Sequence, residues 1–262
     1  MYFLGIDIGS LSSDAVIINQ EEQILATSVV PTGARNKEAI DRVIQDVLRM
    51  SNLSKNDISS IVSTGYGRDR VQDRLSAVTE ITCHARGIQK TIPGTQLLID
   101  IGGQDSKAIL LDGKGKVLDF AMNDKCAAGT GRFLEAMARA LQVDIEDMSQ
   151  LDHGATKNLT LSSMCTVFAE SEVVSLIAEG SEVNEIVAGM NRAIASRICS
   201  LVKRVVSDLT DKKIAMSGGV ARNEGVIRAI QEILQTKIAV PQEPDTIGAL
   251  GAALIAKEKT SA

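Results

Sequence analysis

Two short turns carry the residue types that hold the phosphates of a nucleotide. The first, Asp7-Ile-Gly-Ser-Leu-Ser-Ser13, supplies a carboxylate, a glycine and three hydroxyls, and the second, Asp100-Ile-Gly-Gly-Gln-Asp105, supplies two glycines beside polar groups. Phosphate binding needs backbone N–H donors, small residues that allow close approach, and a metal held by carboxylates. One turn with Asp and Gly is most often an ordinary β-turn. Two related copies, with a third glycine turn at Ser217-Gly-Gly-Val-Ala-Arg-Asn223, indicate a nucleotide site.

The first two turns belong to an internal repeat. Leu4-Gly-Ile-Asp-Ile-Gly-Ser10 matches Leu97-Leu-Ile-Asp-Ile-Gly-Gly103, and the match continues with Ser13 on Ser106 and Ala15 on Ala108. Each copy has the pattern of a β-hairpin around its turn, followed by a third strand at residues 23–29 or 116–120. Two related βββ units predict two lobes with a cleft between them.

Helices and strands alternate through the rest of the chain. Apolar spacing predicts helices at 37–50, 132–141, 172–178, 184–207, 224–234 and 247–257, and strands at 58–64 and 213–216. The sequence therefore predicts an α/β protein with duplicated βββαβα units. We expect lobe I to span residues 1–93 and lobe II residues 94–246, with the C-terminal helix within 247–262 packing back on lobe I.

The chain has four cysteines, and two of them have matching surroundings. Cys126 and Cys165 each precede a predicted helix, and a helix N-terminus favours the thiolate that ligates iron. A cubane cluster takes about four protein thiolates, so one chain cannot complete it this way, whereas two chains related by a two-fold axis can. The alternative is a pair of buried structural cysteines, which is the commoner fate of a free cysteine.

Five segments together carry a resemblance to a known family. TGYGR at 64–68, IDIGGQD at 99–105, NDKCAAGTGRFLE at 123–135, CTVFAESE at 165–172 and GGVARN at 218–223 resemble the activators of 2-hydroxyacyl-CoA dehydratases. These belong to the BadF/BadG/BcrA/BcrD-type ATPases, which include the ATPase subunits of benzoyl-CoA reductase. The resemblance covers nearly the whole chain and implies the two-lobed actin/Hsp70/sugar-kinase fold, which is ribonuclease H-like.

The resemblance implies an ATP and Mg²⁺ site between the lobes. It places Asp7 and Asp100 near Mg²⁺ and Gln104 near the γ-phosphate, and these three residues are the implied catalytic residues. The residues it implies as nucleotide contacts are Gly9, Ser10, Leu11, Ser12, Ser13, Gly102, Gly103, Lys125, Gly129, Thr130, Gly218, Gly219 and Asn223.

The resemblance also implies an electron-transfer function. In the family, two subunits share one [4Fe–4S] cluster, held by the cysteines that match Cys126 and Cys165, and ATP hydrolysis drives a low-potential electron into a partner enzyme. The implied partners are a second copy of the chain, an iron–sulfur dehydratase or reductase, and reduced ferredoxin or flavodoxin as electron donor. Cys83, Cys199 and His84 match no ligand motif, and we assign them structural roles.

One position departs from the family pattern. Dehydratase activators commonly carry Lys after the first turn, where this chain has Asp14. Asp14 either approaches the phosphates, with Mg²⁺ or another base compensating, or faces solvent. The departure leaves open a partner of another kind, such as a double-cubane iron–sulfur enzyme.

Composition narrows the remaining function classes. The net charge of −5, an aromatic content of 2% and the absence of Trp argue against a nucleic-acid partner. No stretch approaches about 20 apolar residues and the N-terminus has no signal-peptide pattern, so we expect a cytoplasmic protein that does not interact with a membrane. A small-molecule kinase of the same fold is the main alternative, but it has no use for the paired cysteines. A chaperone-like ATPase or scaffold is a third possibility, but chaperones of this fold carry an added substrate domain that we do not expect at this length.

Overall fold

A computed structural model describes residues 1–157, 159–161 and 165–261 of the chain. Within these residues there are two five-stranded sheets. The first has the order β3 (Ile24–Pro31), β2 (Ser12–Asn19), β1 (Tyr2–Ile8), β4 (Ile58–Thr64) and β5 (Ser76–Ala77). The second has the order β10 (Ile238–Ala239), β9 (Ile214–Ser217), β6 (Leu97–Ile101), β7 (Ser106–Leu111) and β8 (Val117–Asn123).

The internal repeat is visible in the strand pairing. In both sheets three consecutive antiparallel strands are followed by a strand that pairs in parallel with the first, β4 with β1 and β9 with β6. The register places Asp7 opposite Asp14 in the first sheet and Asp100 opposite Lys107 in the second. The predicted α/β class with duplicated units is confirmed.

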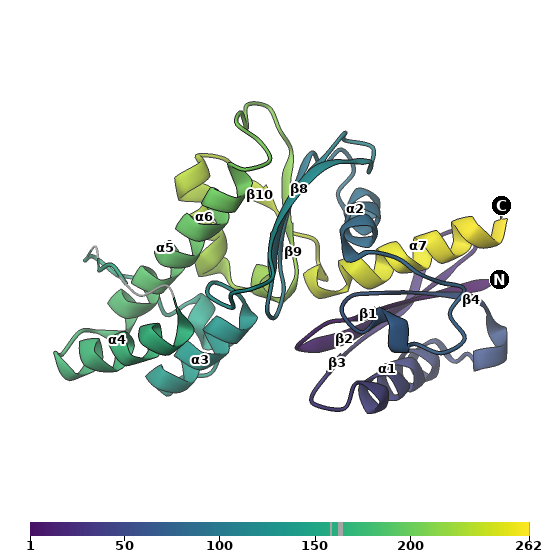
Figure 1. The fold of residues 1–262 in the computed structure, drawn as a ribbon, viewed down its shortest axis with the longest axis horizontal. Coiled ribbons are helices and arrows are strands. Elements are labelled where there is room, and N and C mark those ends of the chain that lie inside the picture. The colour runs from purple at the N-terminus through teal and green to yellow at the C-terminus, as the bar shows by residue number, and fades with distance from the viewer. Residues whose placement is uncertain (158, 162–164, 262) are drawn as a thin grey trace.

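Helices cover both faces of the first sheet (Figure 1). Leu4, Ile6 and Ile8 of β1 pack on α1 (Asn36–Ser51), whereas Phe3 packs on α7 (Ile247–Ser261). Because side chains alternate along a strand, Asp7 shares the α7 face with Phe3 and Gly5. A Cβ on Gly5 would lie 1.9 Å from the carbonyl oxygen of Ala249, so glycine is needed for this close approach.

Helix α2 (Glu80–Thr91) lies between the two sheets. Ala85 and Ile88 share a core with Leu98 and Ile109 of the second sheet, and Ile247 at the start of α7 joins them. A Cβ on Gly251 would lie 1.8 Å from the carbonyl oxygen of Cys83, so α7 also packs closely on α2. The lobe limits at residues 93 and 246 stay a proposal.

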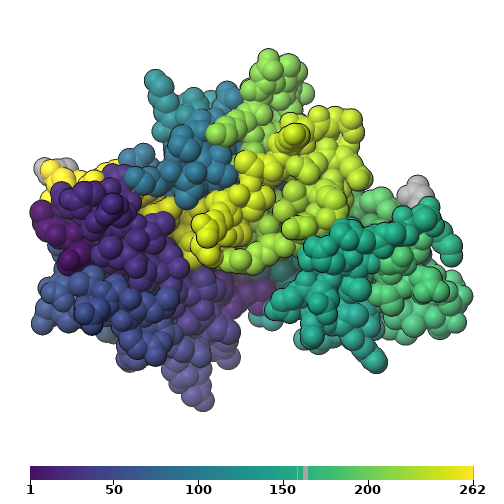
Figure 2. Space-filling model, turned by 180° about the vertical axis from the view of Figure 1, so that it is seen from behind, coloured from purple at the N-terminus to yellow at the C-terminus, as the bar shows by residue number. Residues whose placement is uncertain are grey.

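The remaining helices cover the other face of the second sheet and extend away from the first. They are α3 (Gly131–Leu141), α4 (Thr166–Ala178), α5 (Val183–Val202) and α6 (Glu224–Leu234), with 3₁₀ turns at Lys55–Asp57, Arg68–Arg70, Asp147–Ser149, Gly219–Arg222 and Pro244–Thr246. Seen from behind, the N-terminal part in purple and blue and the helical part in teal and green lie at opposite ends, with the yellow C-terminal region between them (Figure 2).

Two predicted helices differ from the structure by at least five residues at one end. Helix α4 begins at Thr166, six residues before the predicted 172. The prediction missed this part because apolar Val167 and Phe168 are exposed on the helix, so the sequence there has no amphipathic pattern. Helix α5 ends at Val202 rather than 207. Beyond it the α-helical hydrogen bonds give way to 3₁₀-type bonds that span three residues, from Arg204 N–H to the Leu201 carbonyl and from Val205 N–H to the Val202 carbonyl. No helix in the described parts of the chain is long and apolar enough to cross a membrane.

Candidate functional site

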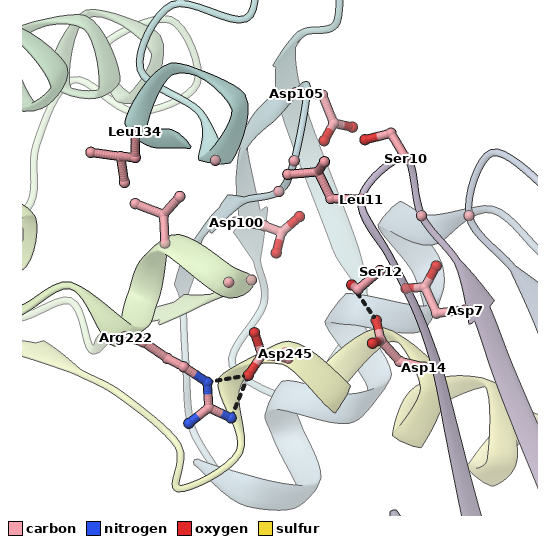
Figure 3. A pocket seen from close by; sticks show the side chains of 18 of the residues that line it. Asp7, Ser10, Leu11, Ser12, Asp14, Asp100, Asp105, Leu134, Arg222 and Asp245 are labelled. Carbon is pink, nitrogen blue, oxygen red and sulfur yellow. Dashed lines mark hydrogen bonds and ion pairs between the residues drawn. The ribbon is translucent and has the colours of Figure 1, made fainter. Parts of the chain in front are cut away.

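The three glycine turns surround one cavity of about 330 Å³. Eleven predicted site residues line it: Asp7, Gly9, Ser10, Leu11, Ser12, Asp100, Gly102, Gly103, Gly218, Gly219 and Asn223. Figure 3 shows the carboxylates of Asp7 and Asp100 on opposite sides of this space, each carried at the end of the first strand of its repeat. The volume is within the usual range for a small-molecule site.

Glycine is required where the turns approach one another. A Cβ on Gly103 would lie 2.6 Å from Leu11 of the first turn. Gly218 has a φ of +85°, and a Cβ there would lie 2.3 Å from the carbonyl oxygen of Ile101. The backbone therefore comes closest where a ligand needs access to main-chain groups.

Five predicted contacts lie outside the cavity lining. Ser13 is buried, and its hydroxyl bonds the Thr32 hydroxyl at 2.8 Å. Gln104 and Lys125 are exposed, and Gly129 is buried with a φ of +86°. The Thr130 hydroxyl donates to the carbonyl oxygens of Gly103 and Ala127, at 3.0 and 2.6 Å. Thr130 thus supports the second turn from behind.

A buried ionic network stands behind the second turn. The ammonium of Lys107, which is 4% exposed, lies 2.7 Å from Asp105, 3.0 Å from Asp100 and 3.2 Å from Glu80. Burial alone would lower the pKa of Lys107, but the three carboxylates outweigh it and raise the pKa above its usual value. Lys107 therefore stays charged.

His84 lies between the two site aspartates. Its Nε2 is 3.7 Å from Asp7 Oδ2 and its Nδ1 is 3.4 Å from Asp100 Oδ1 and 3.3 Å from the Ser217 hydroxyl. We assigned His84 a structural role, and the structure adds that the residue lines the cavity and lies beside both aspartates.

The two aspartates differ in their electrostatic surroundings. Burial raises the pKa of Asp7 to about 6, and His84 offsets only part of that effect. Burial would also raise the pKa of Asp100, but His84, Lys107 and the Ser217 hydroxyl outweigh it and lower the pKa to about 2. Asp100 is therefore held as a carboxylate by this chain, whereas Asp7 lacks equivalent compensation.

Asp14 does not face solvent. It is 5% exposed and lines the cavity. Of the two alternatives that the sequence left open for Asp14, the solvent-facing one is therefore wrong. Burial, and then the charges of Asp7 and Asp245, raise the pKa of Asp14 well above its usual range.

Sequence reasoning missed several cavity residues besides His84. Lys107, Glu80, Arg222 and Asp245 all line it, and Arg222 pairs with Asp245. Two of them had a usable signal. Lys107 is placed opposite Asp100 by the repeat, and Arg222 lies within the third glycine turn. Glu80 and Asp245 come from segments outside the three turns.

The two candidate cluster cysteines lie in different settings. Cys165 is the exposed N-cap residue of α4, while residues 162–164 before it lie outside the described residues. Cys126 is half-buried in the loop after β8, and α3 begins only at Gly131 behind the N-cap Thr130. Cys126 precedes α3, as predicted, but the cap Thr130 and Gly129, which has a positive φ, separate it from the helix N-terminus.

The remaining thiols are packed in the interior. Cys83 and Cys199 are buried, and burial raises the pKa of Cys83 to about 12 and that of Cys199 to about 11. Within the described residues no group of three or more His, Cys, Asp or Glu forms a metal site. Cys126 and Cys165 are free thiols, half-buried and exposed respectively.

Comparison with known proteins gives consistent results. The profile of the BadF/BadG/BcrA/BcrD ATPase family matches residues 4–256. The activator of lactoyl-CoA dehydratase from Anaerotignum propionicum is 48% identical over 98% of both chains.

Solved structures agree with the sequence match. Component A of (R)-2-hydroxyglutaryl-CoA dehydratase from Acidaminococcus fermentans superposes with a TM-score of 0.95 at 41% identity, covering 100% of both chains. The activator of 2-hydroxyisocaproyl-CoA dehydratase from Clostridium difficile, with bound ADPNP, superposes with a TM-score of 0.93 at 43% identity, and the match covers 100% of this chain and 96% of that one.

A more distant structure shows the fold alone. A ROK family glucokinase from Streptomyces griseus gives a TM-score of 0.60 at 17% identity, covering 98% of this chain and 100% of that chain. The predicted actin/Hsp70/sugar-kinase architecture is thereby confirmed. With the profile match over nearly the whole length, the chain belongs to the BadF/BadG/BcrA/BcrD ATPase family.

Proposed function

We propose that this ATPase is a reductive activator, which couples ATP hydrolysis to the delivery of a low-potential electron into an iron–sulfur partner enzyme. One structural observation supports it above the others. The loop that carries Cys126 is hydrogen-bonded to the second phosphate turn through Thr130, Gly131 and Arg132. Such a connection would let nucleotide binding at the second turn act on the loop that carries Cys126.

The connection is made by the backbone as well as the Thr130 hydroxyl. The N–H groups of Gly131 and Arg132 donate to the carbonyl oxygens of Gly102 and Gly103, at 3.0 and 2.9 Å. A shift of the second turn on nucleotide binding would therefore carry the start of α3 with it. Helix α3 shares an apolar core with α4, through Phe133, Met137, Ala169 and Val173, and α4 carries Cys165 at its N-cap.

The cavity suits ATP with Mg²⁺. Ser10, Ser12 and the glycines of the three turns supply hydroxyl and main-chain groups for phosphates, and Asp7 and Asp100 supply carboxylates on both sides. Mg²⁺, when bound, neutralises phosphate charge that develops during hydrolysis. Gln104, Ser13, Lys125, Gly129 and Thr130 keep their proposed roles at or behind the phosphates.

The cysteines suit a cluster shared by two chains. Each chain offers the free thiols of Cys126 and Cys165, so a homodimer supplies the ligand number of a [4Fe–4S] cluster. The cluster supplies a low-potential electron carrier. Next to Cys165, helix α4 exposes Val167, Phe168 and Val174, with exposed fractions of 68%, 65% and 54%. An apolar face of this kind is typical of an interface, and a second copy would cover it.

The partner class follows from the relatives. Proteins more than 40% identical to this chain are named as activators of lactoyl-CoA, 2-hydroxyisocaproyl-CoA and (R)-2-hydroxyglutaryl-CoA dehydratases. We infer an iron–sulfur dehydratase or related reductase, such as a double-cubane enzyme, as electron acceptor. Reduced ferredoxin or flavodoxin would be the donor, in the cytoplasm.

Iron analysis of anaerobically purified protein tests the proposal. Wild type should be brown and carry about four iron and four sulfide per dimer. Cys126→Ala and Cys165→Ala should lose the cluster, while Cys199→Ala, which removes a buried thiol from the same lobe, should retain it. A colourless wild type, or a full cluster in either of the first two variants, would refute the electron-transfer function and favour a kinase.

A further inference from the structure

We propose that Asp105 is a catalytic residue of ATP hydrolysis, and that its carboxylate holds the attacking water beside the terminal phosphate of bound ATP. Asp105 would act together with Asp7, Asp100 and Gln104, the residues that the resemblance implies as catalytic. This role goes beyond the proposed function, because it involves neither the cysteines nor a partner enzyme.

Asp105 lies where the first two glycine turns meet. Figure 3 shows its carboxylate beside the Ser10 hydroxyl, with Leu134 on the other side of the cavity. A Cβ on Gly103 would lie 2.8 Å from the Ser10 hydroxyl oxygen, so the two turns approach each other closely here. Both turns offer groups for phosphates, whereas an apolar wall suits the base. Because the terminal phosphate is the part of ATP farthest from the base, we place it next to Asp105.

A carboxylate is an unexpected group in a turn that binds phosphate. Asp105 is 6% exposed and lines the cavity, and like charges repel at short range. The repeat places Ser12 at the matching position of the first turn, where a hydroxyl can donate a hydrogen bond to phosphate. An ionised carboxylate can only accept one, so Asp105 needs a partner that donates hydrogen bonds and carries no negative charge. Water meets both requirements.

The neighbours of Asp105 fix its carboxylate and leave one oxygen available. The Lys107 ammonium lies 2.7 Å from Oδ2 and compensates its charge. Oδ1 would lie 2.7 Å from a Cβ on Gly102, so the space beside this oxygen is open only because the residue is glycine. In contrast to Asp14 Oδ1, Asp105 Oδ1 is not enclosed without a hydrogen-bond partner among the described residues. A water molecule at Oδ1 would therefore be held in the cavity by a carboxylate of fixed orientation.

A water molecule held in this way has the chemistry for hydrolysis. One of its O–H groups donates to Asp105, which orients an oxygen lone pair toward the terminal phosphorus. The water oxygen bonds to phosphorus while the bond from phosphorus to the bridging oxygen breaks, and ADP leaves with that electron pair. The water proton passes to Asp105 and then to the released phosphate. Burial raises the pKa of Asp105 and Lys107 offsets only part of that effect, so this carboxylate accepts a proton more readily than an exposed one does.

Other polar groups near Asp105 are less suited to this role. Gln104 is exposed and lies outside the cavity lining. Glu80 also contacts the Lys107 ammonium, at 3.2 Å, but it belongs to α2 rather than to a phosphate turn. Tyr66 lines the cavity, but burial and the charge of Asp105 raise the pKa of its phenol, which stays protonated and cannot take the proton. Asp105 is the group in the second turn that can both hold the water and accept its proton.

Single-turnover hydrolysis of ATP by the anaerobically purified protein tests this role. Asp105→Asn should lower the rate constant by about a hundredfold or more, because an amide cannot accept the water proton. Its affinity for ADPNP, measured by titration calorimetry, should be unchanged or higher, because the carboxylate repels phosphate. Asp105→Glu keeps a charge for Lys107 but displaces the carboxylate, so it should bind ADPNP and hydrolyse ATP at least about tenfold more slowly than wild type.

Two further variants separate this role from a general effect of charge. Glu80→Gln removes another carboxylate from Lys107 and should slow hydrolysis by less than about tenfold. Asp119→Asn removes an exposed charge from β8 and should hydrolyse ATP as wild type does. Hydrolysis at the wild-type rate in Asp105→Asn or Asp105→Glu, a fall in the ADPNP affinity of Asp105→Asn, or equal slowing by Glu80→Gln would overturn the proposal. Iron content should be the same in all variants, so the cluster and the role of Asp105 stand or fail separately.

Discussion

At the scale of single residues, Asp7 and Asp100 occupy matching positions near the ends of β1 and β6, but their surroundings shift their pKa values in opposite directions. Asp100 has a buried cation opposite it and a pKa of about 2, whereas Asp7 has a second carboxylate opposite it and a pKa of about 6. Both face the cavity. The same change at the two positions should therefore have opposite effects on stability.

Asp7→Asn should stabilise the metal-free, nucleotide-free protein above pH 6. The folded state binds the Asp7 proton more tightly than the unfolded chain, whose pKa is 3.8, so the wild-type free energy of unfolding falls as the pH rises from about 4 to about 6. Asn carries no charge to desolvate. At pH 8 we expect a gain of up to about 3 kcal/mol, measured by denaturant titration, with ATP hydrolysis falling about a hundredfold.

Asp100→Asn is the matched control for that experiment. It leaves the buried Lys107 with one carboxylate fewer, so the free energy of unfolding should decrease. ATP hydrolysis should decrease as it does in Asp7→Asn. Stability changes of the same sign in the two variants would contradict the electrostatic difference between the lobes.

At the scale of elements, Thr130 is the side chain that joins the Cys126 loop to the second turn. Its hydroxyl reaches the carbonyl oxygens of Gly103 and Ala127. Thr130→Val keeps the shape and removes the hydroxyl, at a cost of about 1 kcal/mol. The variant should bind ATP and hold the cluster, but lose most ATP-dependent electron transfer.

The control for Thr130→Val is Thr95→Val. Thr95 is equally buried, and its hydroxyl donates to the Ile92 carbonyl at 2.7 Å, away from the cavity. Thr95→Val should lower the free energy of unfolding by a similar amount and leave electron transfer per ATP unchanged. If both variants transferred electrons as wild type does, the hydrogen-bonded connection would have no part in coupling.

The exposed face of α4 makes a prediction about assembly. Phe168→Asp places a charge on the face that we assign to the second copy, so sedimentation should show monomers and the cluster should be lost. Phe120→Asp is the control, because Phe120 is also exposed, at 49%, but lies on β8. If the Phe168→Asp variant still formed a dimer, the interface would not lie on this face of α4.

Much of this arrangement could be predicted from local sequence. The strands β1 and β6 are apolar runs that end in Asp and Gly, so both the repeat and the cavity aspartates were recognisable. The path of the loop from Cys126 to α3 could not be predicted, because only the backbone shows that Gly129 has a positive φ. His84 was missed because its role depends on α2 packing between the sheets, which brings it to two aspartates from different lobes.

At the scale of the whole molecule, the nucleotide cavity and the cysteines are separate but mechanically connected. The cavity lies between the sheets, while α4 extends from the second sheet to the end of the molecule opposite α1 (Figure 1). Nucleotide can affect the cluster only if it binds two conformations with different affinities. The effect must then be reciprocal, so the state of the cluster changes nucleotide affinity.

The most direct test of this coupling is the reduction potential of the cluster in the dimer with ADP and with a non-hydrolysable ATP analogue. The two potentials should differ, and iron chelators should reach the cluster at different rates in the two complexes. Tight association with the partner enzyme should occur only with the analogue. Identical potentials, chelation rates and partner affinities would show an iron–sulfur ATPase without energy coupling, and would contradict the proposed function.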